Sequence, residues 1–400
     1  MALMPVEEAL AKILHNARPL ATESLPLRQA PGRVLAKPVL ANRDQPPFNA
    51  SAMDGYAIRS SDLQEHATTL KLIGTSAAGH GHKGTVQSGQ AIRILTGAPL
   101  PKGADTIVIQ EMVQAKKNQI TVNAPSGTGR NIRPKGLDFH RGDVLIAART
   151  LMSARNIGLA AAGNAARVIV HKKPTVVIFT TGDELVLPGA TPRWDQIVSS
   201  NSLSIEAMAK AWGANVKNLG IVRDSLKSIE AAIHKALHAD ILVTTGGASV
   251  GDHDYVQQAL KNCGVKIGFW KIALRPGKPL MFGTKAKTRI IGLPGNPVSA
   301  LVCARIFLKP LLEALQGLTH RTDETTAQLA APLPPNDGRK DYIRATLKTA
   351  SDGTRMVTPH STQDSSMQRT LAQSHCLIVR EPHALSAVKG AAVNILILDF

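Results

Sequence analysis

The sequence has few cysteines, few aromatic residues and no long apolar runs. Its 400 residues include three cysteines, Cys263, Cys303 and Cys376, with no C-x-x-C spacing, so neither a disulfide framework nor a structural zinc site is indicated. No run of about 18 apolar residues occurs, which argues against a membrane span. The first residues carry Glu7 and Glu8 inside a helical pattern instead of a basic start and an apolar stretch, so we expect a cytoplasmic protein without an export signal.

The net charge of +18 is large but spread along the chain. By region it is about +9 over residues 1–170, +8 over 171–315 and +1 over 316–400. No Lys/Arg-rich segment of five to eight residues occurs, and 3% aromatic residues leave little to stack on exposed bases. The pattern favours weak attraction of small anions over a specific nucleic-acid partner.

The length and the 44% hydrophobic content are typical of a soluble multidomain protein. Residues 1–44 and 145–170 read as a helical domain, into which residues 45–144, rich in short β-type runs, are inserted as a small β domain. Residues 171–318 form an α/β domain. After a polar linker, residues 319–400 are expected to form a C-terminal β domain.

The α/β domain alternates short β-branched runs with helical patterns, which predicts a doubly wound, mostly parallel sheet. The ligand of such a sheet lies at the carboxyl ends of its strands. Expected strands cover 175–180, 216–219, 240–244, 266–272 and 289–291, and expected helices cover 201–212, 226–237, 254–263 and 297–315.

Glycine-bearing loops follow three of these strands and can bring backbone N–H groups close to an anion. A single loop of this kind usually just turns the chain, but three at one sheet edge favour a phosphate-binding site. No Walker motif, G-x-G-x-x-G or G-x-S-x-G is present. The loops supply Thr181, Gly182, Gly246, Gly247, Ser249, Pro294, Gly295, Asn296 and Pro297 as candidate substrate-binding residues.

Acidic and basic residues lie on the same strand-end loops. Glu184, Asp224 and Asp254 follow the first three strands, and carboxylates beside phosphate oxygens are what Mg²⁺ uses as ligands. Each acid alone is more simply a surface or helix-capping residue. Lys271, Arg275 and Lys278 surround a Pro-Gly turn and suit an oxyanion, although without the neighbouring glycine loops a solvated loop would explain them equally well.

Six motifs together resemble the molybdopterin molybdenumtransferase family, which includes MoeA and the C-terminal domain of gephyrin. They span nearly the whole chain, and their order and spacing match the family, whereas any one alone would be a weak signal. The motifs are PPFNASAMDGYA, RILTGAP followed by GADTIV, TGDELV, TTGGASVGDHDY, LRPGKP and GLPGNPVSA.

The resemblance implies an Mg²⁺-dependent enzyme of molybdenum cofactor assembly. Family members take adenylylated molybdopterin and molybdate, release AMP and leave molybdenum on the pterin dithiolene. They are homodimers with a site at the subunit interface, which Asp54 and Thr96 would reach from the partner subunit. By the same likeness Glu184, Asp224, Asp254, Lys271 and Arg275 match family site positions, as do, less closely, Arg344 and Ser365 in the last domain. We expect the carboxylates to position the metal and the molybdate or water.

Some residues depart from the family pattern, and two other functions stay open. Asp364 stands where a glycine often precedes the serine, Leu137 stands where an acid is common, and Ser374-His375-Cys376 replaces an Ala-Asn pair. One alternative is molybdopterin adenylylation, against which the N-terminal motifs argue. The other is a catalytically silent binding module.

Overall fold

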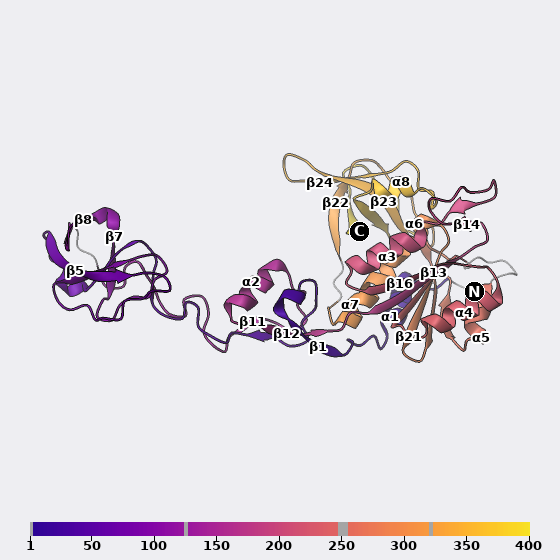
Figure 1. Cartoon of the computed structure of the whole chain (residues 1–400). Helices are drawn as coiled ribbons and strands as arrows, with labels where there is room; N and C mark the ends of the chain where they lie inside the picture. Colours follow the sequence, from indigo (N-terminus) through magenta and orange to yellow (C-terminus); the bar gives the residue numbers. More distant parts are fainter. Residues whose placement is uncertain (1–2, 124–126, 247–254, 320–322) are drawn as a thin grey trace. The chain divides into compact units, whose positions relative to one another are not determined.

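The computed structural model describes residues 3–123, 127–246, 255–319 and 323–400 (Figure 1). It divides into two compact units. The first comprises residues 1–23, 32–34 and 171–400, and the second comprises residues 24–31 and 35–170. No helix in the described ranges is long and apolar enough to cross a membrane.

The first unit contains a six-stranded sheet with the expected doubly wound arrangement. Four parallel strands lie in the order β16-β13-β17-β21, and the antiparallel β20 joins them to β18. The parallel strands are rich in buried Val, Ile and Thr, as expected for strands covered on both faces. The strands are β13 (Thr175–Thr181), β16 (Asn215–Val222), β17 (Ile241–Thr245), β18 (Lys266–Trp270), β20 (Met281–Lys285) and β21 (Thr288–Leu293).

Helices cover both faces of this sheet, each with its own apolar core (Figure 1). One face carries α1 (Val6–Leu14), α3 (Asn201–Ala211) and a continuous helical segment of α6 (Pro297–Cys303), a π-helical turn (Ala304–Leu308) and α7 (Lys309–Gln316). The other face carries α4 (Leu226–Ala236) and α5 (Tyr255–Asn262). A short pair, β14 (Leu185–Val186) and β15 (Ile197–Val198), lies in the loop after β13.

The C-terminal part forms a second six-stranded sheet, as the sequence predicts. A short strand from the α/β region, β19 (Leu274–Arg275), pairs with β23 at the edge of this sheet, so the two regions share hydrogen bonds. The other elements are β22 (Glu324–Leu329), β23 (Lys340–Thr349), β24 (Arg355–Pro359), α8 (Gln368–Ala372), β25 (Cys376–Arg380) and β26 (Ala392–Ile397).

The second unit contains the expected β domain, a six-stranded sheet in the order β7-β4-β6-β5-β9-β8. Its strands are β4 (Gly55–Ile58), β5 (Thr68–Ser76), β6 (Gln90–Ile94), β7 (Thr106–Ile109), β8 (Val113–Lys116) and β9 (Gln119–Val122). Short pairs flank it: β3 (Ala50–Ser51) with β10 (Ile132–Arg133), and β2 (Val39–Leu40) with β11 (Val144–Ile146). Three short 3₁₀ turns, η1 (Leu27–Gln29), η2 (Ser60–Asp62) and η3 (Gln110–Met112), join strands.

The expectation of a helical domain over 1–44 and 145–170 is wrong in detail. Residues 1–44 contain one α-helix, α1, whose Val6, Ala9 and Ile13 are buried in the core of the α/β sheet. The rest forms β1 (Thr22–Pro26), η1 and β2, and residues 145–170 contain α2 (Ala154–Ala162) and most of β12 (Arg167–His171), which pairs with β1. The helical pattern near the start of the sequence is confirmed as α1. The apolar face of this helix, however, packs on a sheet whose strands lie more than 150 residues later in the sequence.

Candidate functional site

A cavity of about 410 Å³ opens at the carboxyl ends of the parallel strands, where doubly wound sheets bind ligands. We call it the strand-end cavity. It brings together six of the predicted site residues, namely Thr181, Glu184, Gly246, Gly295, Asn296 and Pro297. The described residues that complete its lining are Thr180, Leu185, Ile197, Val198, Ser199, Ser200, Asn201, Ser366 and Gln368.

The predicted carboxylates Asp224 and Glu184 both lie next to the end of β13. Thr181 Oγ1 at the end of β13 donates to Asp224 Oδ1 just after β16, at 3.0 Å. Glu184 folds back over the turn, since a Cβ on Gly182 would lie 2.5 Å from its Oε2. The prediction that Glu184 and Asp224 lie at one sheet edge is confirmed by these positions.

Gly246, at the end of β17, allows two strand ends to approach closely. It adopts a φ of +83°, and a Cβ at this position would lie 2.2 Å from the carbonyl oxygen of Thr181. Both observations require glycine. One step earlier, Thr245 Oγ1 donates to Thr180 Oγ1 at 2.8 Å, so the floor of the cavity is rigidly bonded.

Two helices begin at the strand-end cavity. Asn201 is the first residue of α3, and Pro297 is the first residue of α6, so both helix N-termini lie there. At α6, Pro297 has no N–H and the Val298 N–H donates to the Ser365 carbonyl oxygen at 3.0 Å, so the uncompensated N–H groups belong mainly to α3, which has no side-chain cap. This arrangement favours an anion.

Sequence reasoning missed Asn201, Ser200 and Gln368. Asn201 Nδ2 donates to the Gly295 carbonyl oxygen at 2.7 Å, while its buried Oδ1 has no hydrogen-bond partner among the described residues. Gln368 donates to Ser200 Oγ at 2.6 Å. The Ser-Ser-Asn run ahead of a helical pattern is a start signal for a helix, and it could have placed α3 at the edge of the site.

The segment 363–366 of the C-terminal sheet region closes one side of this cavity. Asn296 Nδ2 donates to Ser365 Oγ at 2.8 Å, so Ser365 lies beside the glycine loop that follows β21. Asp364 Oδ1 accepts from the Ser366 N–H at 2.8 Å, and the Ser366 hydrogen bonds lower the pKa of the Asp364 carboxyl. The unusual aspartate therefore holds the turn that carries Ser365.

Arg344 and Arg275 line a different cavity, of about 630 Å³, on the C-terminal sheet. Arg344 is 1% exposed, burial lowers its pKa, and its guanidinium donates to Gln363 Oε1 at 3.0 Å and to the Asp364 carbonyl oxygen at 2.6 Å. The segment 363–366 thus contacts both cavities, because Gln363 lines one and Ser366 lines the other.

The expectation that Arg275 shares a crevice with Glu184 and Asp224 is wrong. Its side chain turns toward the C-terminal sheet, where Nε donates to Asp341 Oδ2 at 2.8 Å and Nη1 donates to Asp337 Oδ2 at 3.1 Å. The Asp341 hydrogen bond raises the pKa of Arg275 further. The reason is β19, which adds Arg275 to the C-terminal sheet beside two carboxylates that sequence spacing does not reveal.

Lys271 and Lys278 lie together at the carboxyl edge but do not line the strand-end cavity. A hydrogen bond from the Ile272 N–H to the Lys278 carbonyl oxygen, at 2.9 Å, closes the turn between them. They follow β18, which is four strand positions from β13, or roughly 19 Å at the usual spacing between strands. Pro294 precedes the cavity-lining Gly295 on the loop after β21.

Asp54 and Thr96 belong to the second unit, where they contact each other. Asp54 Oδ1 accepts from both the backbone N–H and the hydroxyl of Thr96, each at 2.7 Å. These bonds lower the pKa of the exposed Asp54 carboxyl. Two sequence motifs some forty residues apart therefore come together at one carboxylate. Both motifs are among those singled out in the sequence. Gly247, Ser249, Asp252 and Asp254 lie outside the described residues.

Three family models match the chain in sequence order. They are the MoeA N-terminal region (domain I and II) over residues 4–163, a probable molybdopterin binding domain over 177–314 and the MoeA C-terminal region (domain IV) over 326–398. A molybdopterin molybdenumtransferase of Nostoc sp. is 37% identical over 359 residues, which is 86% of this chain and 82% of the relative. The chain belongs to the molybdopterin molybdenumtransferase family.

Other members of the molybdenumtransferase family match over almost the full length. The molybdopterin molybdenumtransferase of Haemophilus influenzae is 33% identical and covers 98% of both chains. A crystal structure of the molybdopterin biosynthesis MoeA protein of Pyrococcus horikoshii has a TM-score of 0.85 and 26% identity, and the match covers 99% of each chain. The fold class expected from the sequence is confirmed by this match.

The donor set at the strand-end cavity of this molybdenumtransferase fits a divalent cation that also contacts an anion. Glu184 is the one charged residue of the described lining, and Asp224 is bonded to Thr181 beside it. An anion bound at the helix N-termini would lie close to these carboxylates and be repelled by them. The described lining holds no cationic side chain that would offset this repulsion. Mg²⁺ commonly takes one or two carboxylates plus phosphate oxygens and water. No group of three or more acidic, His or Cys side chains forms a complete metal site within the described residues.

Proposed function

We propose that this chain transfers molybdenum from molybdate to adenylylated molybdopterin and releases AMP. The observation that carries the proposal is the strand-end cavity, in which glycine turns and two helix N-termini meet beside Glu184 and Asp224. The assignment of this chain to its family supports the reaction.

The chemistry requires two anions, a phosphoanhydride and molybdate, to come together. Backbone N–H groups at the uncapped α3 N-terminus supply fixed partial positive charge for one of them. Asn201, held by the Gly295 carbonyl, offers a buried side-chain oxygen to a ligand hydroxyl or amine.

Glu184 and Asp224 are the residues that would hold Mg²⁺ in this proposal. When bound, the ion would neutralise phosphate oxygens and favour departure of AMP. Thr181 fixes the Asp224 carboxylate by its 3.0 Å hydrogen bond, which keeps one oxygen oriented before any ligand arrives. Asp254 is a further candidate from the sequence.

The proposed active form is a homodimer in which Asp54 and Thr96 of one subunit complete the site of the other. The Thr96 hydrogen bonds lower the pKa of the Asp54 carboxyl and orient one carboxylate oxygen. An exposed, pre-oriented carboxylate suits the positioning of molybdate or water. Arg344, buried and bonded to Gln363 and the Asp364 carbonyl oxygen, would hold the segment 363–366 in place at the edge of the site.

The test is a turnover assay with adenylylated molybdopterin, molybdate and Mg²⁺. Asp224→Ala is expected to lower molybdenum insertion at least about 100-fold, because preorganised electrostatic groups commonly contribute that much. Asp352→Ala, at an exposed turn of the C-terminal sheet, is the matched control and should retain activity. Circular dichroism would show that both variants remain folded. Undiminished insertion by Asp224→Ala contradicts the proposed role.

The same assay separates the two other functions. AMP release that depends on molybdate supports the transferase. Consumption of ATP with molybdopterin would instead indicate adenylylation, and tight pterin binding without AMP release would indicate a silent binding module.

A further inference from the structure

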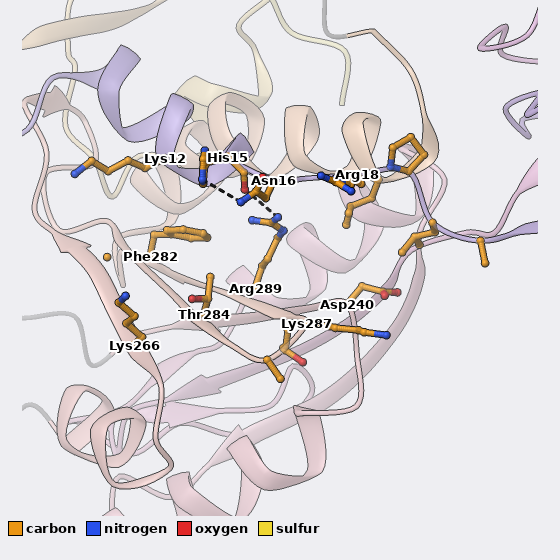
Figure 2. A pocket seen from close by; sticks show the side chains of 17 residues that line it. Lys12, His15, Asn16, Arg18, Asp240, Lys266, Phe282, Thr284, Lys287 and Arg289 are labelled. Carbon is orange, nitrogen blue, oxygen red and sulfur yellow. Dashed lines mark hydrogen bonds between the residues drawn. The ribbon is translucent and has the colours of Figure 1, made fainter.

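A second, larger cavity of about 860 Å³ lies at the opposite edge of the α/β sheet (Figure 2). Its sheet residues lie at the starts of the parallel strands, such as Lys266 on β18 and Arg289 on β21, whereas the strand-end cavity lies at their other ends. Residues of α1 and of the segment that follows it form the facing side, as Figure 2 shows. We call this the basic cavity.

The charge of the basic cavity is strongly unbalanced. Its lining includes five Lys or Arg side chains, contributed by α1, the segment after α1, β18 and the region from β20 to β21. Its one carboxylate, Asp240, is already engaged, since Oδ2 accepts from the N–H and the hydroxyl of Thr175 at 2.7 Å each. The five cationic residues are Lys12, Arg18, Lys266, Lys287 and Arg289.

Two of the five cations have structural partners, and three do not. Arg289 donates to the carbonyl oxygens of Ile13 and His15, both at 3.1 Å, and so holds the end of α1. Lys12 lies 3.4 Å from Glu8 in an exposed pair one turn away. Within the described part of the chain, Arg18, Lys266 and Lys287 have no hydrogen-bonding or ion-pair partner for their side chains.

The floor of the basic cavity is apolar and open enough for a small molecule. Phe282 and Gly268 lie on neighbouring strands, and the Phe282 ring covers the position where Gly268 lacks a side chain. Thr284 adds a hydroxyl group. The volume falls within the range of about 300–1,000 Å³ that is usual for ligand sites.

We propose that the basic cavity binds a small molecule that carries two or more phosphate groups. Lysine ammonium groups act as point charges that suit phosphate oxygens, and cations from four separate segments match several anionic groups better than one. Without such a ligand, several positively charged side chains would lie close together in a concave surface, and no bound anion would offset their mutual repulsion. The basic cavity is separate from the proposed transferase site. It gives a specific role to part of the chain's net charge of +18.

The experiment is isothermal titration of the full-length protein with inorganic tripolyphosphate, at constant ionic strength and without divalent cations. Lys266→Gln/Lys287→Gln removes two unpaired cations and leaves the Arg289 contact with α1 intact. We expect saturable binding by the unchanged protein and a Kd at least about tenfold higher for this double variant. Lys235→Gln/Lys261→Gln, on α4 and α5 at the other face of the sheet, removes the same charge and should bind as the unchanged protein does.

A third variant distinguishes the two edges of the sheet. Lys271→Gln/Lys278→Gln alters the carboxyl edge and should leave tripolyphosphate binding to the basic cavity unchanged, whereas Lys266→Gln/Lys287→Gln should leave molybdenum insertion unchanged. Absence of saturable binding by the unchanged protein would overturn the proposal. Equal weakening by the α4/α5 variant, or weakening by the carboxyl-edge variant alone, would overturn it as well. Each of these results leaves the transferase assay unaffected.

Discussion

Gly246 shows at the scale of one residue how the strand-end cavity is built. Its φ of +83° and the 2.2 Å approach of an added Cβ to the Thr181 carbonyl oxygen leave no room for a side chain. The Thr181 backbone cannot move away freely, because its hydroxyl holds Asp224 and its strand is bonded on both sides. The glycine therefore sets the positions of two other residues of the site.

Gly246→Ala is expected to destabilise the protein by about 3 kcal/mol, from the left-handed backbone and the clash together. Gly353→Ala is the control, since Gly353 has a φ of +85° but nothing lies within 4 Å of an added Cβ. That variant should cost only about 1 kcal/mol, the backbone contribution alone. Urea unfolding measures both free energies. Equal losses in the two variants would show that the contact with Thr181 does not matter.

Elements explain which parts of the site could be predicted from the sequence. The run at 175–180 and the helix at 201–212 have strong local patterns, and β13 and α3 match them within a residue or two. Loops after parallel strands meet at one edge by topology alone, so Glu184, Asp224 and Gly246 could be grouped. The direction of the Arg275 side chain could not be predicted from the sequence, because it depends on the pairing of β19 with a strand some 65 residues later.

The long helical segment from α6 to α7 is tied to the C-terminus by an ion-pair network. Arg305, 3% exposed on its side chain, lies 2.7 Å from both Asp323 and Asp399, and Lys309 contacts the same two carboxylates at 2.7 Å. Burial raises the pKa of Asp323, but the hydrogen bonds and charges of Lys309 and Arg305 outweigh it, so the pKa lies below its ordinary value. The network therefore stabilises the fold while Asp323 is ionised.

Asp323→Asn is expected to lower the free energy of unfolding by about 1 kcal/mol at pH 7, a value kept small because the side chain is 43% exposed. A carboxyl whose pKa is lowered in the folded state stabilises above its unfolded pKa of about 3.9, and this stabilisation is lost as pH falls through the folded pKa. The difference between variant and unchanged protein should therefore shrink as pH falls below about 3.9 and vanish below the folded-state pKa of Asp323. Unfolding at several pH values measures it. A difference that persists in acid would contradict the electrostatic origin.

At the scale of the whole molecule, the proposed homodimer would draw on residues of both units. Glu184 and Asp224 lie in the first unit, while Asp54 and Thr96 lie in the second. If the second unit serves the partner subunit, a chain that lacks Asp54 and a chain that lacks Asp224 can complement each other. The prediction rests on the proposed function.

Asp54→Ala and Asp224→Ala chains should each be inactive alone. When the two are co-expressed and associate at random, half of the dimers are mixed and each has one intact site, so about a quarter of the activity should return. Molybdenum insertion by the unseparated mixture measures this recovery, and mixed dimers purified through two different tags should show about half the activity of the unchanged dimer. If Asp54 served the site of its own chain, no recovery would occur.

The central claim is that the carboxyl edge of the α/β sheet gathers the anionic reactants. A crystal of the protein soaked with molybdate, AMP and Mg²⁺ tests it most directly. The account predicts an anion at the N-termini of α3 and α6, in contact with Gly246 and Gly295, and a cation bound by Glu184 and Asp224. Clear density for molybdate and AMP elsewhere, with the strand-end cavity filled by water alone, would contradict it.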